Sequence, residues 1–351
     1  MALVWTEHQP AGAADKAWLT AAMDSDGSAV IAGIYGARLW MTVDSGANWT
    51  EPRPAGDANK NWWTVCMDAD GSHILAGNGA GRLWLSTNSG ANWSEVRPDG
   101  DVDRQWRASA MDDDGSVIIV ASYSSTATQG RIWVSTNTGA NWTEARPAGD
   151  ADFLWGCLAT DSDGSVIIAG AYGGRLWLSV DTGANWTEEQ PEWASNKQWN
   201  RASMDADGSV IMAAIAGLHI YVTTDTGANW ARVQPDGDTN SSWFIAAVSR
   251  TDGSSQLAGI FANRLYGSVD TGANWAEEQP GGAANLNWYF GAMDADGSNV
   301  VAVANAGRLW LGVEAAAGSV KKLSGIAWAS VKKVAGVAVA SVKKVEGIAA
   351  Q

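Results

Sequence analysis

The most frequent acidic motif in the sequence is Asp-x-Asp-Gly, which begins at Asp24, Asp68 and Asp112 and has four later relatives. Two carboxylates so close to a glycine could open a calcium-binding loop, but that loop also needs a bidentate glutamate several residues later. Here the chain continues directly into apolar residues, as in the run 166–170, Val-Ile-Ile-Ala-Gly. A tight turn between two strands therefore explains the motif better, and calcium stays open as the alternative.

A second acidic motif ends in tryptophan and reads Thr-Val-Asp-Ser-Gly-Ala-Asn-Trp at residues 42–49. The acidic position is held by Asp44, Asn88, Asn137, Asp181, Asp225 and Asp270, and the seventh copy is reduced to Glu314. Asn keeps the hydrogen-bond acceptor of Asp but loses its charge, which acid–base catalysis would not tolerate. We therefore expect these side chains to accept backbone N–H groups in tight turns, with the glycine supplying a positive φ.

Residues that could hold a metal ion or a redox cofactor are few and scattered. Cys66 and Cys157 stand at different positions of the repeat, which indicates two buried thiols rather than a disulfide or a metal pair. His8, His73 and His219 form no cluster in the sequence. We expect no cofactor, no metal and no catalytic residue.

The elements that position these motifs repeat with a period close to 45 residues. The tryptophans of the second motif are Trp5, Trp49, Trp93, Trp142, Trp186, Trp230 and Trp275. In the unit 142–185, four short runs read as strands: Thr-Glu-Ala, Trp-Gly-Cys-Leu-Ala-Thr, Ser-Val-Ile-Ile-Ala-Gly and Arg-Leu-Trp-Leu-Ser. Four antiparallel strands per unit at this period are typical of propeller blades.

The propeller region begins and ends part-way through a repeat unit. The last unit stops at Glu314 without its expected continuation, and the chain begins with the missing piece, Val-Trp-Thr-Glu at 4–7. The N-terminal strand would then complete the last blade and remove its exposed edge. The sequence thus predicts an all-β, seven-bladed propeller over residues 1–314 and a short repetitive tail over 315–351.

The tryptophan motif resembles the Asp-box of bacterial neuraminidase repeats, most clearly at residues 42–49 and around Asp181, Asp225 and Asp270. The resemblance covers about nine tenths of the chain and implies a propeller. Asp-box repeats occur in sialidases, xyloglucan-degrading glycosidases, sorting receptors and a photosystem II assembly factor, so the resemblance implies no single activity.

The arginines do not form the carboxylate-binding triad that the sialidase resemblance would imply. Six of them hold one repeat position, just before Leu-Trp or its equivalent: Arg38, Arg82, Arg131, Arg175, Arg264 and Arg308. Residues related by a ring repeat cannot converge on one point, so we expect these arginines to brace neighbouring blades or to cover tryptophan faces. Among residues of the innermost strands, Arg107 and Arg201 lie near the strand starts. A glycoside hydrolase is kept as a third, disfavoured alternative.

Variation between the repeats collects in the loops of one face of the predicted propeller. The aromatic residues in these loops are the candidate ligand contacts: Tyr35, Tyr123, Tyr172, Trp193 and Phe261. Aromatic side chains beside carboxylates are typical of protein or carbohydrate contact surfaces. The alternative is a solvated face that only keeps the ring soluble.

The last 33 residues form three 11-residue repeats that begin Ser-Val-Lys-Lys and have a net charge of +5, within a chain of net charge −15. A Gly in each repeat favours short strands over a helical supercoil. We expect the tail to dock on a protein partner or on a second copy, with a solvated tail as the alternative. The candidate docking residues are Lys321, Lys322, Trp328, Lys332, Lys333, Lys343 and Lys344.

Charge and hydropathy narrow the partners further. A net charge of −15 argues against sequence-independent nucleic-acid binding. No uncharged apolar run reaches the roughly 18 residues that span a membrane, and the N-terminus lacks the pattern of a signal peptide. We expect a non-enzymatic propeller in a virion or the cytoplasm, presented on an assembly by its tail and offering its loop face to a partner or a glycan. The main alternative is a soluble Asp-box scaffold factor that binds a protein partner.

Overall fold

The computed structural model describes residues 3–123, 130–149, 153–191, 196–237, 240–282 and 284–315, with the backbone of 333–334 and 337–338. Its contacts divide the chain into two units, Met1–Glu314 and Ala315–Gln351. Every regular element among the described residues is a β-strand. No helix that could cross a membrane occurs in this described part.

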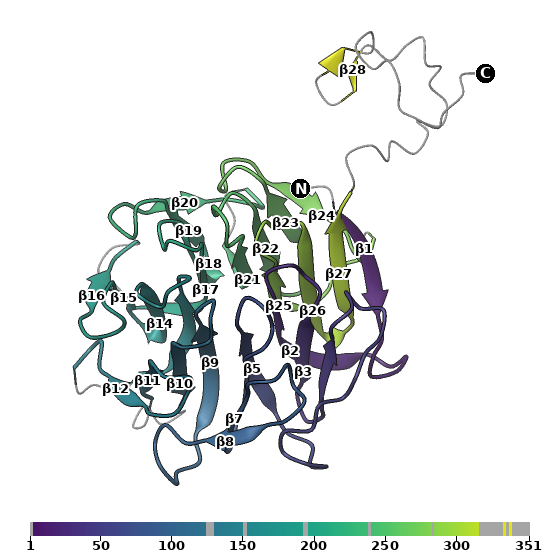
Figure 1. The fold of residues 1–351 in the computed structure, drawn as a ribbon. Helices are drawn as coiled ribbons and strands as arrows, with labels where there is room; N and C mark the ends of the chain where they lie inside the picture. The colour runs from purple at the N-terminus through teal and green to yellow at the C-terminus, as the bar shows by residue number, and fades with distance from the viewer. Residues whose placement is uncertain are drawn as a thin grey trace. The chain divides into compact units, whose positions relative to one another are not determined.

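Strands β1–β27 form seven antiparallel units arranged in a ring (Figure 1). The first three complete units along the chain are β2 (Lys16–Met23), β3 (Val30–Ile34) and β4 (Leu39–Thr42); β5 (Trp62–Met67), β6 (Ile74–Asn78), β7 (Leu83–Ser86) and β8 (Ser94–Val96); and β9 (Gln105–Met111), β10 (Ile118–Tyr123), β11 (Ile132–Ser135) and β12 (Thr143–Ala145). In the first, a bridge between Met41 and Thr50 takes the place of a fourth strand.

The remaining units continue in the same order. They are β13 (Trp155–Thr160), β14 (Ile167–Gly174), β15 (Leu176–Ser179) and β16 (Thr187–Glu189); β17 (Lys197–Met204), β18 (Ile211–Leu218), β19 (Ile220–Thr223) and β20 (Ala231–Val233); β21 (Ser241–Val248), β22 (Gln256–Ile260), β23 (Leu265–Ser268) and β24 (Ala276–Glu278); and β25 (Trp288–Met293), β26 (Asn299–Gly307), β27 (Leu309–Glu314) and β1 (Leu3–His8). In the second compact unit, β28 (Lys333–Val334) pairs with β29 (Val337–Ala338).

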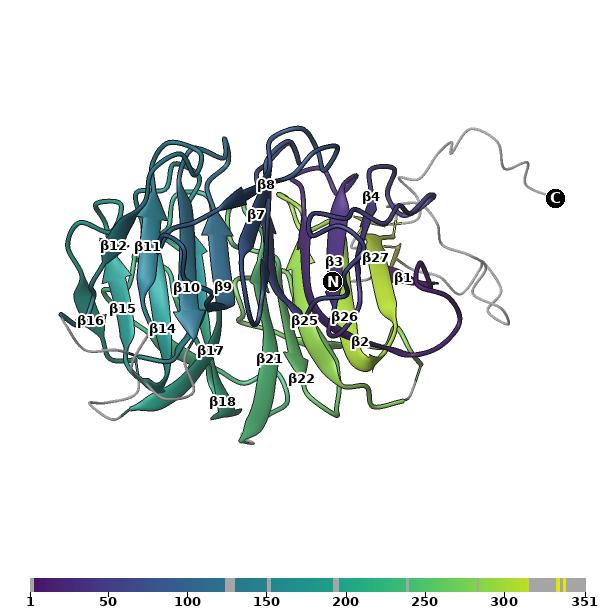
Figure 2. The same cartoon turned by 90° about the horizontal axis from the view of Figure 1, so that it is seen from below.

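The N-terminal strand closes the ring, as the sequence predicts. Strand β1 pairs antiparallel with β27, with Leu3 opposite Glu314 and His8 opposite Leu309, and the two strands lie side by side in Figures 1 and 2. Trp5 Nε1 also donates a hydrogen bond to Glu278 Oε2 of the preceding unit, 3.0 Å away. Closure therefore joins both the last sheet and its neighbour, which leaves no open end in the ring.

The core consists of apolar layers, each shared by consecutive units. One layer, for example, holds Ile119 of β10 and Trp155 of β13, with Trp186 packed against it. Each of the seven layers contains one tryptophan of the repeated motif: Trp5, Trp49, Trp93, Trp142, Trp186, Trp230 and Trp275. The repeated tryptophan thus packs between sheets, where its large apolar surface leaves water.

A second closed ring of hydrogen bonds joins the Asp-x-Asp-Gly turns that follow the innermost strands. Backbone N–H groups there donate to carbonyl oxygens of the next unit: Ser25 to Ala69, Ala69 to Asp113, Asp113 to Ser162, Ser162 to Ala206, Ala206 to Arg250, Thr251 to Ala295 and Ala295 to Ser25. The N···O distances are 2.6–3.1 Å, and the series returns to its starting residue. This belt fixes one end of the ring independently of β1.

The repeated arginines brace their units at two places. Several reach the loop that leads to the next unit, since Arg38 Nη2 donates to the carbonyl oxygen of Asp57 at 2.6 Å and Arg82 Nε lies 2.6 Å from Asp103. All six also pair with a glutamate of their own unit, as Arg175 does with Glu188 at 3.3 Å and Arg131 with Glu144 at 3.1 Å. The other four pairs are Arg38–Glu51, Arg82–Glu95, Arg264–Glu277 and Arg308–Glu7. In the strand ladder each glutamate lies opposite the residue two places after the arginine, as Glu144 lies opposite Trp133 and Glu188 opposite Trp177. The arginine–glutamate ion pair therefore helps to hold the short edge strand to its sheet.

Candidate functional site

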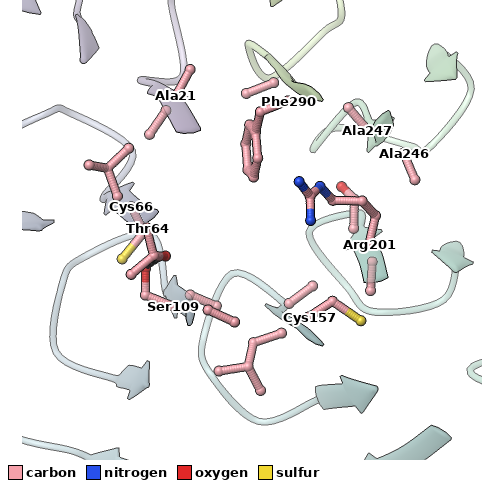
Figure 3. A pocket seen from close by; sticks show the side chains of 18 of the residues that line it. Ala21, Thr64, Cys66, Ser109, Cys157, Arg201, Ala246, Ala247 and Phe290 are labelled. Atoms are coloured by element: carbon pink, nitrogen blue, oxygen red, sulfur yellow. Dashed lines mark hydrogen bonds between the residues drawn. The ribbon is translucent and has the colours of Figure 1, made fainter. Parts of the chain in front are cut away.

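A central pocket of about 230 Å³ lies where the seven innermost strands meet. Most of its wall is small, with Ala21, Ala246 and Ala247 among the residues drawn in Figure 3. Arg201 extends its guanidinium into this pocket, near the ring of Phe290 (Figure 3). Cys66 and Cys157 also line the pocket as free thiols, and burial raises the pKa of each to about 12. Both are therefore protonated and unreactive at neutral pH.

One mouth of the pocket is built from β-bulges. In every unit the ladder between the first two strands shifts register just after the inner tryptophan, which leaves one extra residue without a partner. The seven extra residues are Leu19, Trp63, Arg107, Gly156, Asn200, Phe244 and Tyr289; we call them the bulge ring. A bulge re-aims its side chain without disturbing the rest of the sheet, so this position can vary freely between units.

Arg107 of the bulge ring is held between two aromatic rings. Its guanidinium carbon lies 4.5 Å from the ring centroid of Trp63 and 5.1 Å from that of Tyr123. The two rings themselves are 6.5 Å apart and tilted by 56°. Tyr123, predicted from the sequence as a ligand contact, therefore belongs to this cluster, and cation–π attraction to both rings fixes the position of Arg107.

Arg201 forms the second cluster at the same mouth. Its Nη1 donates to the carbonyl oxygen of Asn200 at 2.6 Å, and its Nη2 donates to that of Tyr289 at 2.8 Å. The guanidinium carbon also lies 5.1 Å from the ring centroid of Phe290 and 5.7 Å from that of Phe244. Burial, with the nearby charge of Arg107 as a smaller cause, lowers the pKa of Arg201 to about 10, so it stays charged at neutral pH.

The opposite end of the pocket is different in kind. Arg250 donates to the carbonyl oxygen of Thr160 at 2.8 Å and forms an ion pair with Asp113, so it ties together three units across the axis. Methionines end the innermost strand in five units: Met23, Met67, Met111, Met204 and Met293. This end holds a smaller pocket of about 120 Å³ and an arginine that an aspartate neutralises, whereas the bulge-ring end carries two arginines and several aromatic rings.

The repeated acidic residues make local hydrogen bonds. Asp44 Oδ1 accepts from the backbone N–H of Asn48 at 2.8 Å, and Asn88 Oδ1 accepts from that of Asn92 at the same distance. Equivalent bonds are made by Asn137, Asp181, Asp225 and Asp270. The turns place a non-glycine residue at positive φ just before the glycine, as at Ser45 with a φ of 53°. These side chains therefore shape turns and do not face the central pocket.

The Asp-x-Asp-Gly carboxylates are also occupied within their own turns. Asp24 Oδ2 accepts from the backbone N–H of Ala29 and the hydroxyl of Ser28, both at 3.0 Å, and burial raises the pKa of Asp24. Asp26 Oδ1 accepts from the N–H of Ser28 at 2.8 Å. The described residues contain no group of three or more His, Cys, Asp or Glu that could hold a metal ion. The turn interpretation accounts for the motif without calcium.

The predicted loop aromatics lie beside the starts of the inner strands, next to the bulge ring. Tyr35 donates its N–H to Ala17, and Phe261 donates its N–H to Ser242. Tyr35 is 48 % exposed and Phe261 is 37 % exposed, while Tyr123 and Tyr172 are half-buried. Phe261 also contacts Phe244, with 5.5 Å between the ring centroids. The structure thus brings Tyr123 and Phe261 together with the bulge ring, but no described ring contact joins Tyr35 or Tyr172 to it.

Some predicted residues fall outside the described part. Trp193 lies there, as do the tail residues Lys321, Lys322, Trp328, Lys332, Lys343 and Lys344, and of Lys333 only the backbone is described. In contrast, sequence reasoning passed over Trp63, Phe244, Tyr289 and Phe290. The signal that could have found Trp63, Phe244 and Tyr289 is the position directly after each inner tryptophan, which differs in every unit, and Phe290 follows Tyr289 in the same strand.

Comparisons with solved structures agree with this architecture. The β-propeller domain of Cps50 (Swd1) from Myceliophteria thermophila superposes with a TM-score of 0.64 at 11 % identity, covering 89 % of this chain and 100 % of that one. The chain is a β-propeller. YCF48 bound to D1 peptide superposes with a TM-score of 0.66 at 15 % identity, covering 89 % and 95 % of the two chains. An ancestral GH74 enzyme gives a TM-score of 0.68 at 17 % identity, covering 88 % of this chain and 46 % of that one.

These likenesses show the fold alone, because identities of 11–17 % do not carry function between propellers. No known protein family matches the sequence, and no curated protein matches it either. The function therefore has to be argued from the bulge ring and its neighbours.

Proposed function

We propose that the protein is a non-enzymatic binding propeller that receives an extended segment of a protein partner at the bulge-ring mouth. The observation that carries this proposal is the bulge ring itself, because its position holds a different residue type in each of the seven units and six of its seven members line the pocket. Aromatic and arginine side chains gather there, and these are the residue types that dominate binding energy at protein interfaces. A pocket of about 230 Å³ accepts side chains or a chain end rather than a folded domain.

A binding role suits the chemistry of the mouth better than glycoside hydrolysis. Hydrolysis of a glycosidic bond needs two carboxyl groups that flank the bond. The central pocket is lined by three arginines and, among its described residues, by no aspartate or glutamate. The acidic turns lie at the other end, where Asp113 is held by Arg250. The likeness to a GH74 enzyme is therefore taken as a likeness of scaffold.

A propeller of the same fold provides a parallel for peptide binding. YCF48 is known in a structure bound to D1 peptide, and it superposes over 89 % of this chain. The parallel supports a peptide as the form of ligand and says nothing of its sequence. Exposed Tyr35 and Phe261 at the rim would extend such a contact beyond the pocket, and a glycan is the alternative ligand for these rim aromatics.

The tail belongs to the second part of this proposal. We infer that residues 319–351 attach the propeller to a larger assembly, either a virion surface or a cytoplasmic scaffold. The support is compositional: six lysines and one glutamate give this segment +5, and the rest of the chain carries −20. A basic segment of only 33 residues is too short to build a core of its own, so ordering it requires a partner surface.

Retention of peptides by the immobilised full chain tests the binding proposal. The probe is a pool of random, N-acetylated short peptides with free C-termini. Trp63→Ala removes an aromatic wall of the mouth and is expected to lower retention about tenfold, the loss that truncating an aromatic anchor commonly causes. Val180→Ala is the matched control, because Val180 is 64 % exposed on a repeated turn at the other end of the sheets.

A further inference from the structure

The central pocket has an unbalanced positive charge within an acidic protein. Of its three arginines, Arg250 is neutralised by Asp113. Neither Arg107 nor Arg201 has a carboxylate partner among the described residues, although the chain as a whole carries −15. Charges taken out of water without a partner destabilise a fold by several kcal/mol, so an arrangement of this kind points to a ligand that supplies the missing charge.

Arg107 is positioned by aromatic rings and keeps its hydrogen-bond donors free. Its guanidinium carbon lies 4.5 Å from the ring centroid of Trp63 and 5.1 Å from that of Tyr123. Cation–π attraction holds the positive group without an oxygen acceptor for its N–H donors. None of these donors bonds to a described residue, which leaves the fork that binds carboxylates in two parallel hydrogen bonds available.

Arg201 is fixed in place but only partly satisfied. Two of its N–H groups donate to the carbonyl oxygens of Asn200 and Tyr289, which are neutral acceptors. Its Nε is enclosed and has no hydrogen-bond partner among the described residues. Arg107 lines the same pocket and carries the same positive charge. An anion bound in this pocket would compensate both charges and supply acceptors for their free N–H groups.

We infer that Arg107 and Arg201 together bind a carboxylate carried by the extended segment of the protein partner. The inference rests on the proposed function and names the chemistry that the partner must bring. A carboxylate fits better than a phosphate, because one negative charge and two oxygens match the few donors that remain free once Arg201 has bonded two carbonyls. The small alanine walls and the Phe290 ring leave room for an apolar residue next to that carboxylate.

The test compares two forms of one peptide pool on the immobilised full chain. The pool contains no Asp or Glu, and it is offered with a free C-terminal carboxylate or with a C-terminal amide. The wild type is expected to retain the acid form about tenfold more than the amide, as one charge-assisted, bidentate contact would give. Arg107→Gln should abolish this preference, and Arg107→Lys, which keeps the charge without the fork, should retain only part of it.

The matched control is Arg38→Gln, which removes an arginine that already pairs with Glu51 on an outer strand; it should leave the acid preference unchanged. Equal retention of both forms by the wild type, or an unchanged preference in Arg107→Gln, would overturn the inference. If both forms are retained equally and Trp63→Ala reduces both, the binding propeller stands and the carboxylate site falls. If neither form is retained, both proposals fall.

Competition with two small anions, succinate and inorganic phosphate, tests whether the bound carboxylate belongs to a peptide or to a free organic acid. Succinate is expected to displace the acid-form peptides only at concentrations far above those of the peptides themselves, because it lacks the contacts with the aromatic walls. If succinate displaces the peptides at concentrations similar to their own, the ligand of this site is a free organic acid and not a segment of a protein partner. Displacement by inorganic phosphate at lower concentrations than succinate would contradict the assignment to a carboxylate.

Discussion

Asp44 and Asn88 stand at the same position of two repeated units, and each accepts a backbone hydrogen bond of 2.8 Å from the residue four places later. The hydrogen bond therefore depends on the side-chain oxygen and not on charge. Both also accept from a hydroxyl two places earlier, and Asp44 alone accepts from the side-chain amide of its Asn48 as well, at 2.7 Å. These bonds, with that from the Asn48 side chain first, lower the pKa of Asp44 below its ordinary value of 3.8.

Replacing the four aspartates of this set with asparagine should make the protein less sensitive to acid. The set comprises Asp44, Asp181, Asp225 and Asp270, and hydrogen bonds lower the pKa of each. A lowered pKa stabilises the fold above pH 3.8, and that stability is lost as the pH falls through the folded-state value. In urea unfolding the wild type should be the more stable protein near pH 7, and its advantage over the variant should shrink below pH 4, where only the wild type loses this contribution.

The wild type already carries asparagine at this turn position in two units, as Asn88 and Asn137, which shows that asparagine fits the turn. If the two proteins lose stability in parallel between pH 4 and pH 2, the ionised form of these aspartates contributes nothing to the turn, and the role assigned to their lowered pKa is wrong. The Asp24-type carboxyls, whose pKa is raised by burial, are the same in both proteins and cancel in this comparison.

Among the elements, the strands could be predicted from the sequence but the bulges could not. The runs Thr143–Ala145 and Trp155–Thr160 are strands with the bounds expected from the glycine-containing turns that separate the short runs. A bulge is a relation between two strands, since Arg107 is unpaired only because Ser122 pairs with Trp106 and Ala121 with Ala108. Strand periodicity alone carries no such information, so Trp63, Phe244 and Tyr289 were missed as members of the site.

Strand β1 makes an element-scale prediction through Trp5. Trp5→Ala removes a half-buried ring from the layer between the last two units and breaks the 3.0 Å bond to Glu278. It should lower the free energy of unfolding by about 3 kcal/mol, and Trp5→Phe, which keeps most of the packing, by about 1 kcal/mol. Urea unfolding followed by tryptophan fluorescence gives both values. Two variants as stable as the wild type would show that closure by β1 does not stabilise the ring.

At the scale of the whole molecule, charge is divided between the two compact units. Residues 319–351 carry +5, and removing them should leave propeller unfolding unchanged within about 0.5 kcal/mol, since every strand of the propeller lies within residues 3–314. The intact chain should sediment as part of a larger species, whereas the variant that ends at residue 318 should sediment as a monomer. Identical monomeric sedimentation of both chains would contradict the attachment role of the tail.

The central claim is that binding takes place at the bulge-ring mouth and not at the repeated turns. Peptide retention by Trp63→Ala relative to Val180→Ala tests it most directly, because the two variants alter opposite ends of the propeller. The account predicts retention about tenfold lower for Trp63→Ala and unchanged for Val180→Ala. Equal retention by the two variants, or a loss confined to Val180→Ala, would contradict it.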